Sequence, residues 1–223
     1  MHKKILFLFA PKFRDFAVDI IRDLIATNPD LQVAGLCMEG ERVVSFIKSN
    51  LPEKYIYKLW DLDALERSWV RDEVLSPEIL AEIDRYLGVG ASGQVIVADR
   101  RIGRGYVRGG LYWPDSLGDL AEAEPISVPL KYLQGLYKFC DQVFEDFKPD
   151  SVFCYAVASA PAVMLGLMCQ AKKVKFLRFT STRVGNLYIL DEGFKSKSQP
   201  ILQEIKSERL TPDSTAMAEQ YLN

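Results

Sequence analysis

The sequence has very little histidine and no clustered cysteine. One of its 223 residues is a histidine, His2, and the four cysteines stand singly in apolar surroundings: Cys37, Cys140, Cys154 and Cys169. With no CxxC pair and no second histidine, the sequence offers no plausible zinc site and no disulfide framework of a small secreted domain. It also lacks a Ser-His-Asp set and a Cys-His pair. These absences predict a protein of the reducing cytoplasm with no metal and no cofactor of its own.

Long hydrophobic runs and excess charge of either sign are also missing. No stretch of about 18 uncharged apolar residues exists, so the sequence predicts no transmembrane helix, although peripheral association with a membrane stays open. The apolar run at residues 5–10 is too short for a signal-peptide core and is followed by Pro11, Lys12 and Arg14. A net charge of -2 and a pI near 5.6 argue against general nucleic-acid binding. Any anion site must therefore be local.

What the chain does have is an alternation of buried strands and amphipathic helices. Apolar runs without alternation, typical of strands buried on both faces, occur at residues 5–9, 31–37, 151–155 and 174–179. Helical spacing of apolar residues occurs between them, most clearly at residues 130–147, before Lys148-Pro149. The pattern predicts an α/β fold: a Rossmann-like, doubly wound, mostly parallel sheet with helices on both faces, forming a single domain over residues 1–223.

Two parts of the chain depart from this rhythm. Residues 61–93 are predicted to be a helical insertion, in which Ser76-Pro77-Glu78 is a helix start with a serine N-cap and proline at the first position. At the carboxyl end, residues 187–190 are predicted to be extended, and Thr211-Pro212-Asp213 is predicted to cap a last helix.

The stretch at residues 94–110 is the first candidate site. Val95 to Ala98 are predicted to form a buried strand that ends at Asp99 and Arg100, and Arg104 and further arginines follow among glycines. Guanidinium groups and exposed backbone N–H groups suit phosphate or carboxylate oxygens, whereas a solvated basic loop is the alternative. The pattern GxxxxGK[ST] is absent, and the glycine spacing at residues 103–109 does not fit a nicotinamide site.

Loops after other strands supply the remaining candidates. Ligands of open α/β sheets bind outside the carboxyl ends of the strands, which places these residues on one edge. The proposed substrate-binding residues are Arg100, Arg104, Ser159, Thr180, Ser181, Arg183 and Asn186. Asp99 is the candidate general base, and the alternative is that it bonds to a neighbouring arginine and holds the shape of the loop. His2 lies at the opposite, amino end of the first strand and is a poor choice for the base. The small residues 156–160 before Pro161 would allow either an anion at a helix N-terminus or tight helix packing.

Four segments carry a resemblance to a known family. They are KKILFLFAPKF, VIVADRRIGRGY, FKPDSVFCYA and FLRFTSTRVGNLYIL. In this layout the chain resembles the N-terminal half of a GT-B type glycosyltransferase of bacterial surface or capsular polysaccharide biosynthesis. The resemblance implies a sugar transferase with two Rossmann-like domains, the nucleotide sugar held mainly by the second and the saccharide acceptor mainly by the first.

These 223 residues are predicted to hold one such domain where the family has two, so they are expected to be either an excised N-terminal domain or a protein that works without donor binding of its own. We therefore expect an acceptor-side domain that has little turnover by itself, with Arg100, Arg104 and Arg183 contacting anionic groups. Two alternatives stay open: a nucleotide-sugar epimerase-like protein of the same architecture, and a non-catalytic α/β module that binds a phosphorylated ligand or a protein partner.

Overall fold

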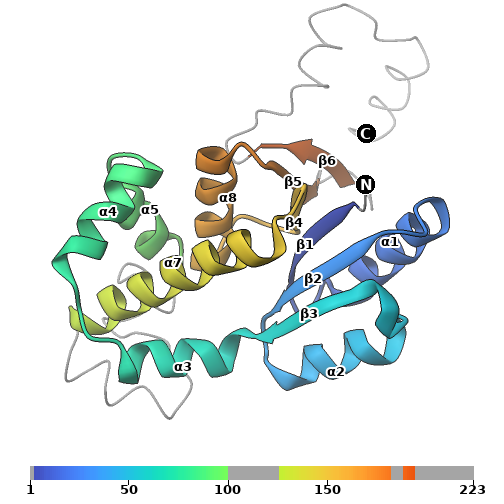
Figure 1. Cartoon of the computed structure of the whole chain (residues 1–223), viewed down its shortest axis with the longest axis horizontal. Coiled ribbons are helices and arrows are strands. Elements are labelled where there is room, and N and C mark those ends of the chain that lie inside the picture. Colours follow the sequence, from blue (N-terminus) through green and yellow to red (C-terminus); the bar gives the residue numbers. More distant parts are fainter. Residues whose placement is uncertain (1–2, 100–125, 182–187, 194–223) are drawn as a thin grey trace, which may run out of the picture.

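The computed structural model describes residues 3–99, 126–181 and 188–193, and leaves the side chains of residues 180–189 undescribed (Figure 1). Its strands are β1 (Lys4–Phe9), β2 (Gln32–Cys37), β3 (Ile56–Asp61), β4 (Ser151–Cys154), β5 (Lys175–Ser181) and β6 (Tyr188–Glu192). Its helices are α1 (Arg14–Thr27), α2 (Glu41–Asn50), α3 (Leu62–Asp72), α4 (Pro77–Leu87), α5 (Ala91–Ala98), α7 (Ser127–Phe147) and α8 (Ala160–Lys172), with a 3-10 turn at Glu53–Tyr55. The predicted helix after Thr211 lies outside the described residues.

The strands form one sheet in the order β3-β2-β1-β4-β5-β6. All neighbouring pairs are parallel except β5 and β6, which run antiparallel. After β1 the chain adds β2 and β3 on one side of that strand. It then crosses over and adds β4, β5 and β6 on the other side. This arrangement confirms the predicted α/β, Rossmann-like, mostly parallel fold and puts the reversal of strand order between β1 and β4.

Helices cover the two faces of the sheet unequally (Figure 1). The alternation of side chains along β1 sends Leu6 and Leu8 toward α3, α4, α5, α7 and α8, and sends Phe7 and Phe9 toward α1 and α2. Because both sets are buried, β1 has no polar face. This explains why the sequence there is a continuous apolar run.

The predicted long helix of the chain is α7, which is 21 residues long. It ends at Lys148, whose φ of 51° is left-handed, and Pro149 then prevents another helical turn. Within the described residues, no helix combines the length and apolar character needed to cross a membrane.

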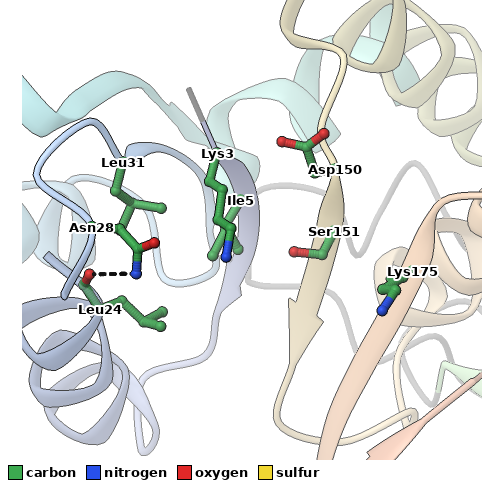
Figure 2. A pocket seen from close by; sticks show the side chains of 8 residues that line it. All are labelled: Lys3, Ile5, Leu24, Asn28, Leu31, Asp150, Ser151 and Lys175. Atoms are coloured by element: carbon green, nitrogen blue, oxygen red, sulfur yellow. Dashed lines mark hydrogen bonds between the residues drawn. The ribbon is translucent and has the colours of Figure 1, made fainter. Parts of the chain in front are cut away.

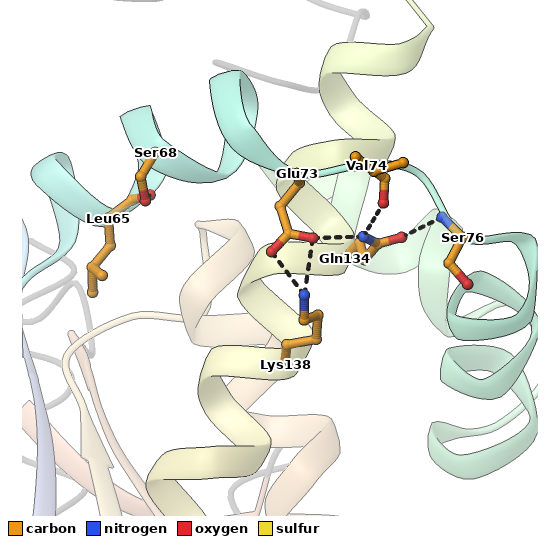
Figure 3. A network of polar contacts seen from close by, with 7 residues as sticks. All are labelled: Leu65, Ser68, Glu73, Val74, Ser76, Gln134 and Lys138. Carbon is orange, nitrogen blue, oxygen red and sulfur yellow. Dashed lines mark hydrogen bonds and ion pairs between the residues drawn. The ribbon is translucent and has the colours of Figure 1, made fainter.

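The predicted helical insertion contains α3 and α4, and its start at Ser76 is as expected: the Ser76 hydroxyl accepts a hydrogen bond from the N–H of Ile79 at 3.3 Å. A buried side chain of α7, Gln134, holds the linker between these helices (Figure 3). Its Oε1 accepts from the N–H of Ser76 at 2.8 Å, and its Nε2 donates to Val74 O at 2.8 Å and to Glu73 Oε2 at 2.6 Å. These bonds satisfy the amide of Gln134 and anchor the insertion on α7.

The strand predicted at Val95 to Ala98 is wrong, because these residues belong to helix α5. Gly90, with a φ of 80°, turns the chain into the helix, and Ala91 and Val95 lie one turn apart on its buried side. Val97 is 70% exposed, which a strand in the middle of this sheet would not allow. A run of four apolar residues occurs in strands and in helices alike. Here the residue that shows helical spacing with Val95 is Ala91, which lies before the run.

Candidate functional site at the carboxyl edge of the sheet

The reversal of strand order brings two short loops together at the carboxyl ends of β1 and β4. Residues 10–13 follow β1, and residues 155–159 follow β4. The neighbouring strand β5 ends at Ser181 on the same edge. Crevices in this position hold the ligands of open α/β sheets.

Asp99 reaches this edge from the end of helix α5, although it does not follow a strand. Its side chain is 3% exposed, and its Oδ2 accepts a hydrogen bond from the N–H of Ala160 at 3.1 Å. Ala160 is the first residue of α8, so the carboxylate sits at the positive end of the helix dipole. The hydrogen bond to the N–H of Ala160 belongs to neither role predicted for Asp99. The bond to a neighbouring arginine and the role as general base both stay predictions, because Arg100 and the arginines that follow lie outside the described residues.

This contact decides between the two interpretations of residues 156–161. A phosphate would need free N–H groups in the first turn of α8, but the N–H of Ala160 is bonded to Asp99 and Pro161 has none. The first ten residues of α8 are all buried, so its small side chains serve close packing. The N-terminus of α8 is thus a poor cradle for an added anion.

Ser159 is the N-cap residue of α8, but its side chain does not cap the helix. Its backbone is extended, with φ -141° and ψ 157°, and its side chain makes no hydrogen bond with any described residue. The Ser159 hydroxyl is therefore half-buried at the edge of the crevice and available to a ligand.

An aromatic contact joins the loop after β1 to the end of β4. The ring of Phe13, which is 2% exposed, stacks on the ring of Tyr155 with their centroids 4.8 Å apart. In a dinucleotide site a glycine occupies this loop so that the pyrophosphate can approach the backbone. Here the loop carries the buried ring of Phe13. Sequence reasoning missed this pair, whose only signal was an aromatic residue shortly after each of two buried strands.

The carboxyl ends of β2 and β3 add a second acidic group, which the sequence analysis did not single out. The carboxylate of Asp61 accepts from the N–H of Ala64 at 2.9 Å and caps α3. Gly40 packs against it with a φ of 59°, where a Cβ would lie 3.0 Å from the Asp61 carboxylate. The sequence signal was an aspartate at the end of a strand, three residues before a backbone N–H of the following helix.

The other predicted site residues divide into two groups. Thr180 and Ser181 belong to the end of β5, so their backbone lies on the predicted edge. Arg100, Arg104, Arg183 and Asn186 lie outside the described residues, as does His2. The structure therefore brings Asp99 and Ser159 together at α8, with the end of β5 beside them.

The described part of the chain offers no activated thiol and no metal centre. All four cysteines are buried, and burial raises the pKa of each thiol, that of Cys37 to about 12 with further contributions from the charges of Asp61 and Glu41. Among these residues, no three His, Cys, Asp or Glu side chains are grouped to hold a metal ion. The described residues of this edge supply hydrogen bonding and carboxyl groups.

Comparison with known proteins adds no family to this picture: no protein-family description matches the chain, and neither a curated protein nor a solved structure is detectably similar to it.

Proposed function

We propose that the chain is the acceptor-side domain of a glycosyltransferase, and that it binds a saccharide at the carboxyl edge beside Asp99 and Ser159. The observation that supports this proposal most is the hydrogen bond from the Ala160 N–H to the buried carboxylate of Asp99. This hydrogen bond places the Asp99 carboxyl group at a helix N-terminus, the position where Rossmann-like domains otherwise receive a phosphate.

The charge selects the kind of ligand. A phosphate within about 5 Å of Asp99 would be repelled by roughly 3 kcal/mol at an effective dielectric constant of about 20. A neutral polyol experiences no such repulsion, and its hydroxyl groups can bond to the Ser159 hydroxyl. In the two-domain architecture that the sequence resembles, the nucleotide sugar belongs to the other domain, so a neutral acceptor here is consistent with that division. Among the described residues, the Asp99 carboxylate disfavours the phosphorylated-ligand alternative; the predicted Arg100, Arg104 and Arg183 lie outside them.

Protein-observed NMR tests the proposal with two probes, a panel of methyl glycosides and inorganic phosphate. We expect glycosides to shift the amide signals of residues 155–160 in the millimolar range, and phosphate to leave them unchanged. Ser159→Ala should weaken glycoside binding about three- to tenfold through loss of one hydrogen bond. Ser49→Ala, a change of the same chemistry on α2, is the matched control.

Asp99→Asn sharpens the test, because the amide oxygen can still accept from Ala160 while the charge is removed. We expect glycoside binding to be retained in this variant, because the binding of a neutral polyol does not depend on the charge at position 99 and the Ala160 N–H keeps its acceptor. Phosphate binding to the unchanged protein at residues 155–160, or no glycoside binding up to about 50 mM, would contradict the proposal.

A further inference from the structure

A cavity lies at the amino edge of the sheet, opposite the candidate site. Its volume is about 490 Å³, within the usual range of small-molecule sites. Side chains from α1 and from the starts of β1, β4 and β5 line it (Figure 2). The lining residues are Lys3, Ile5, Leu24, Asn28, Leu31, Asp150, Ser151 and Lys175.

The sheet register builds the floor of this cavity. Ile5 on β1 pairs with Ser151 on β4, which pairs with Lys175 on β5. Directly paired residues of parallel strands point to the same face, so an apolar group, a hydroxyl and an ammonium group follow one another at the strand spacing of about 4.8 Å. The face is that of α1, because Ile5 belongs to the core cluster beneath that helix.

The wall on the α1 side is apolar. Leu24 and Leu31 flank the end of α1, and the Asn28 amide caps that end by donating to Leu24 O at 3.2 Å. Figure 2 shows these residues on one side of Lys3, with Asp150, Ser151 and Lys175 on the other. The cavity is therefore apolar toward α1 and polar toward β4 and β5.

The charges of the lining are not balanced internally. Asp150 accepts a hydrogen bond from the backbone N–H of Lys4 at 2.8 Å, which fixes its carboxylate at the start of β1. Lys3 and Lys175 form no ion pair with any described residue, and the hydroxyl of Ser151 has no hydrogen-bond partner among the described residues. Two lysines and one aspartate leave the lining with a charge of +1.

We propose that this amino-edge cavity binds a small, singly charged anion with an apolar body, such as a short-chain carboxylate. The anionic group lies at Ser151 between Lys3 and Lys175, and the hydrocarbon part lies against Ile5, Leu24 and Leu31. The site is separate from the carboxyl edge, because it lies at the other ends of β1 and β4. It is independent of the saccharide proposal.

Three probes of the same chain length test the site by protein-observed NMR: hexanoate, 1-hexanol and hexylammonium. We expect hexanoate to shift the amide signals of Leu24, Asn28, Ser151 and Lys175 with a dissociation constant on the order of 1 mM. The alcohol should bind about three- to tenfold more weakly, and the cation should not bind. Added salt should weaken hexanoate binding and leave the alcohol unaffected.

The variant Lys3→Gln/Lys175→Gln should reduce hexanoate binding to that of the alcohol. Both lysines are exposed, so the fold should tolerate the change, and retained dispersion of the amide spectrum checks this. Lys48→Gln, an exposed lysine on α2, is the matched control and should bind as the unchanged protein does. Equal affinity for hexanoate and hexanol, signal changes only at the carboxyl edge, or no saturable shift up to about 20 mM would each overturn the proposal.

Discussion

The two faces of the sheet are built on different principles. The face covered by α3, α4, α5, α7 and α8 buries polar side chains along with its apolar ones: Glu66, Asp99 and Gln134 are each less than 5% exposed. The face covered by α1 and α2 is a cluster of aliphatic and aromatic side chains. Apolar contacts supply stability without direction, whereas buried hydrogen bonds require one geometry. The first face therefore fixes the position of its helices more narrowly.

The extent to which helices cover the sheet also differs between its two faces. The whole of α8 packs on β4 and β5 on the first face, but on the second face α1 ends beside β1. Toward β5 and β6 the second face carries Phe179, which is half-buried, and Leu190, which is 49% exposed. The amino-edge cavity opens where this cover ends. We call the first the closed face and the second the open face.

The largest expected difference between the faces is in stability. Leu136 on α7 is fully buried at the closed face, and Leu24 on α1 is half-buried at the open face. Leu136→Ala should lower the free energy of unfolding by about 3 kcal/mol and Leu24→Ala by about 1 kcal/mol, since the cost rises with the buried apolar area removed and with the volume of the resulting cavity. Urea denaturation measures both. Equal losses would mean that the open face is packed as tightly as the closed one.

A smaller effect is expected from the buried hydrogen bonds of the closed face. Two tyrosines of α7 donate to glutamates at nearly the same distance, Tyr132 to Glu66 at 2.8 Å and Tyr137 to Glu82 at 2.9 Å. The bond between Tyr132 and Glu66 is buried, whereas the bond between Tyr137 and Glu82 is partly exposed. Tyr132→Phe should therefore cost about 1 to 2 kcal/mol of the free energy of unfolding, and Tyr137→Phe, the matched control, about 0.5 kcal/mol. A larger loss for the control would show that burial does not govern these bonds.

The smallest expected effect is a difference in local opening. Cys37 lies in the core of the open face, and Cys140, Cys154 and Cys169 lie in the core of the closed face. In thiol labelling of the folded protein at pH 8, located by mass spectrometry, we expect Cys37 to react about twofold faster than the other three. Faster labelling of any closed-face cysteine would reverse the comparison.

The pH dependence of that labelling follows from the pKa of Cys37, which is raised from 9.0 to about 12, mainly by burial. The folded thiol stays protonated at pH 8, so labelling requires opening, and the rate should rise with pH as the opened thiol ionises. Because the unfolded state loses its proton first, the contribution of Cys37 to stability is complete below about pH 9 and is lost between about pH 9 and pH 12.

Much of the sheet could be predicted from the sequence, because strands buried on both faces leave continuous apolar runs. The segments that became β1, β2, β4 and β5 are of this kind, and Ser76 and Lys148-Pro149 marked helix ends by local backbone chemistry. The apolar run from Val95 to Ala98 was misassigned to a strand, because a short helix that is buried on one side can contain the same four apolar residues. Over so few residues the periodicity of apolar side chains does not show whether they pack in a sheet or in a helix.

The candidate site was predictable only in part. Ser159 and the end of β5 could be placed at the carboxyl edge because a parallel sheet aligns strand ends. The bond between Asp99 and Ala160 could not be predicted, since it joins residues 61 positions apart through the packing of α5 on α8. The amino-edge cavity was missed altogether. The cavity depends on the register of three strands and on the position at which α1 ends, and no local sequence motif predicts either of them.

The strand order also has a consequence for how the chain assembles. β1 pairs with β2, whose residues follow some 28 positions later, as Lys4 and Gln32 do, but its other edge pairs with β4, where Ile5 meets Ser151. Contacts so distant in sequence form slowly. A nascent chain can complete the β1–β2–β3 half first, and its apolar β1 edge then stays unpaired until β4 has been synthesised. During that interval the middle of the future sheet is an open edge, the point at which we expect association with other chains to compete with folding.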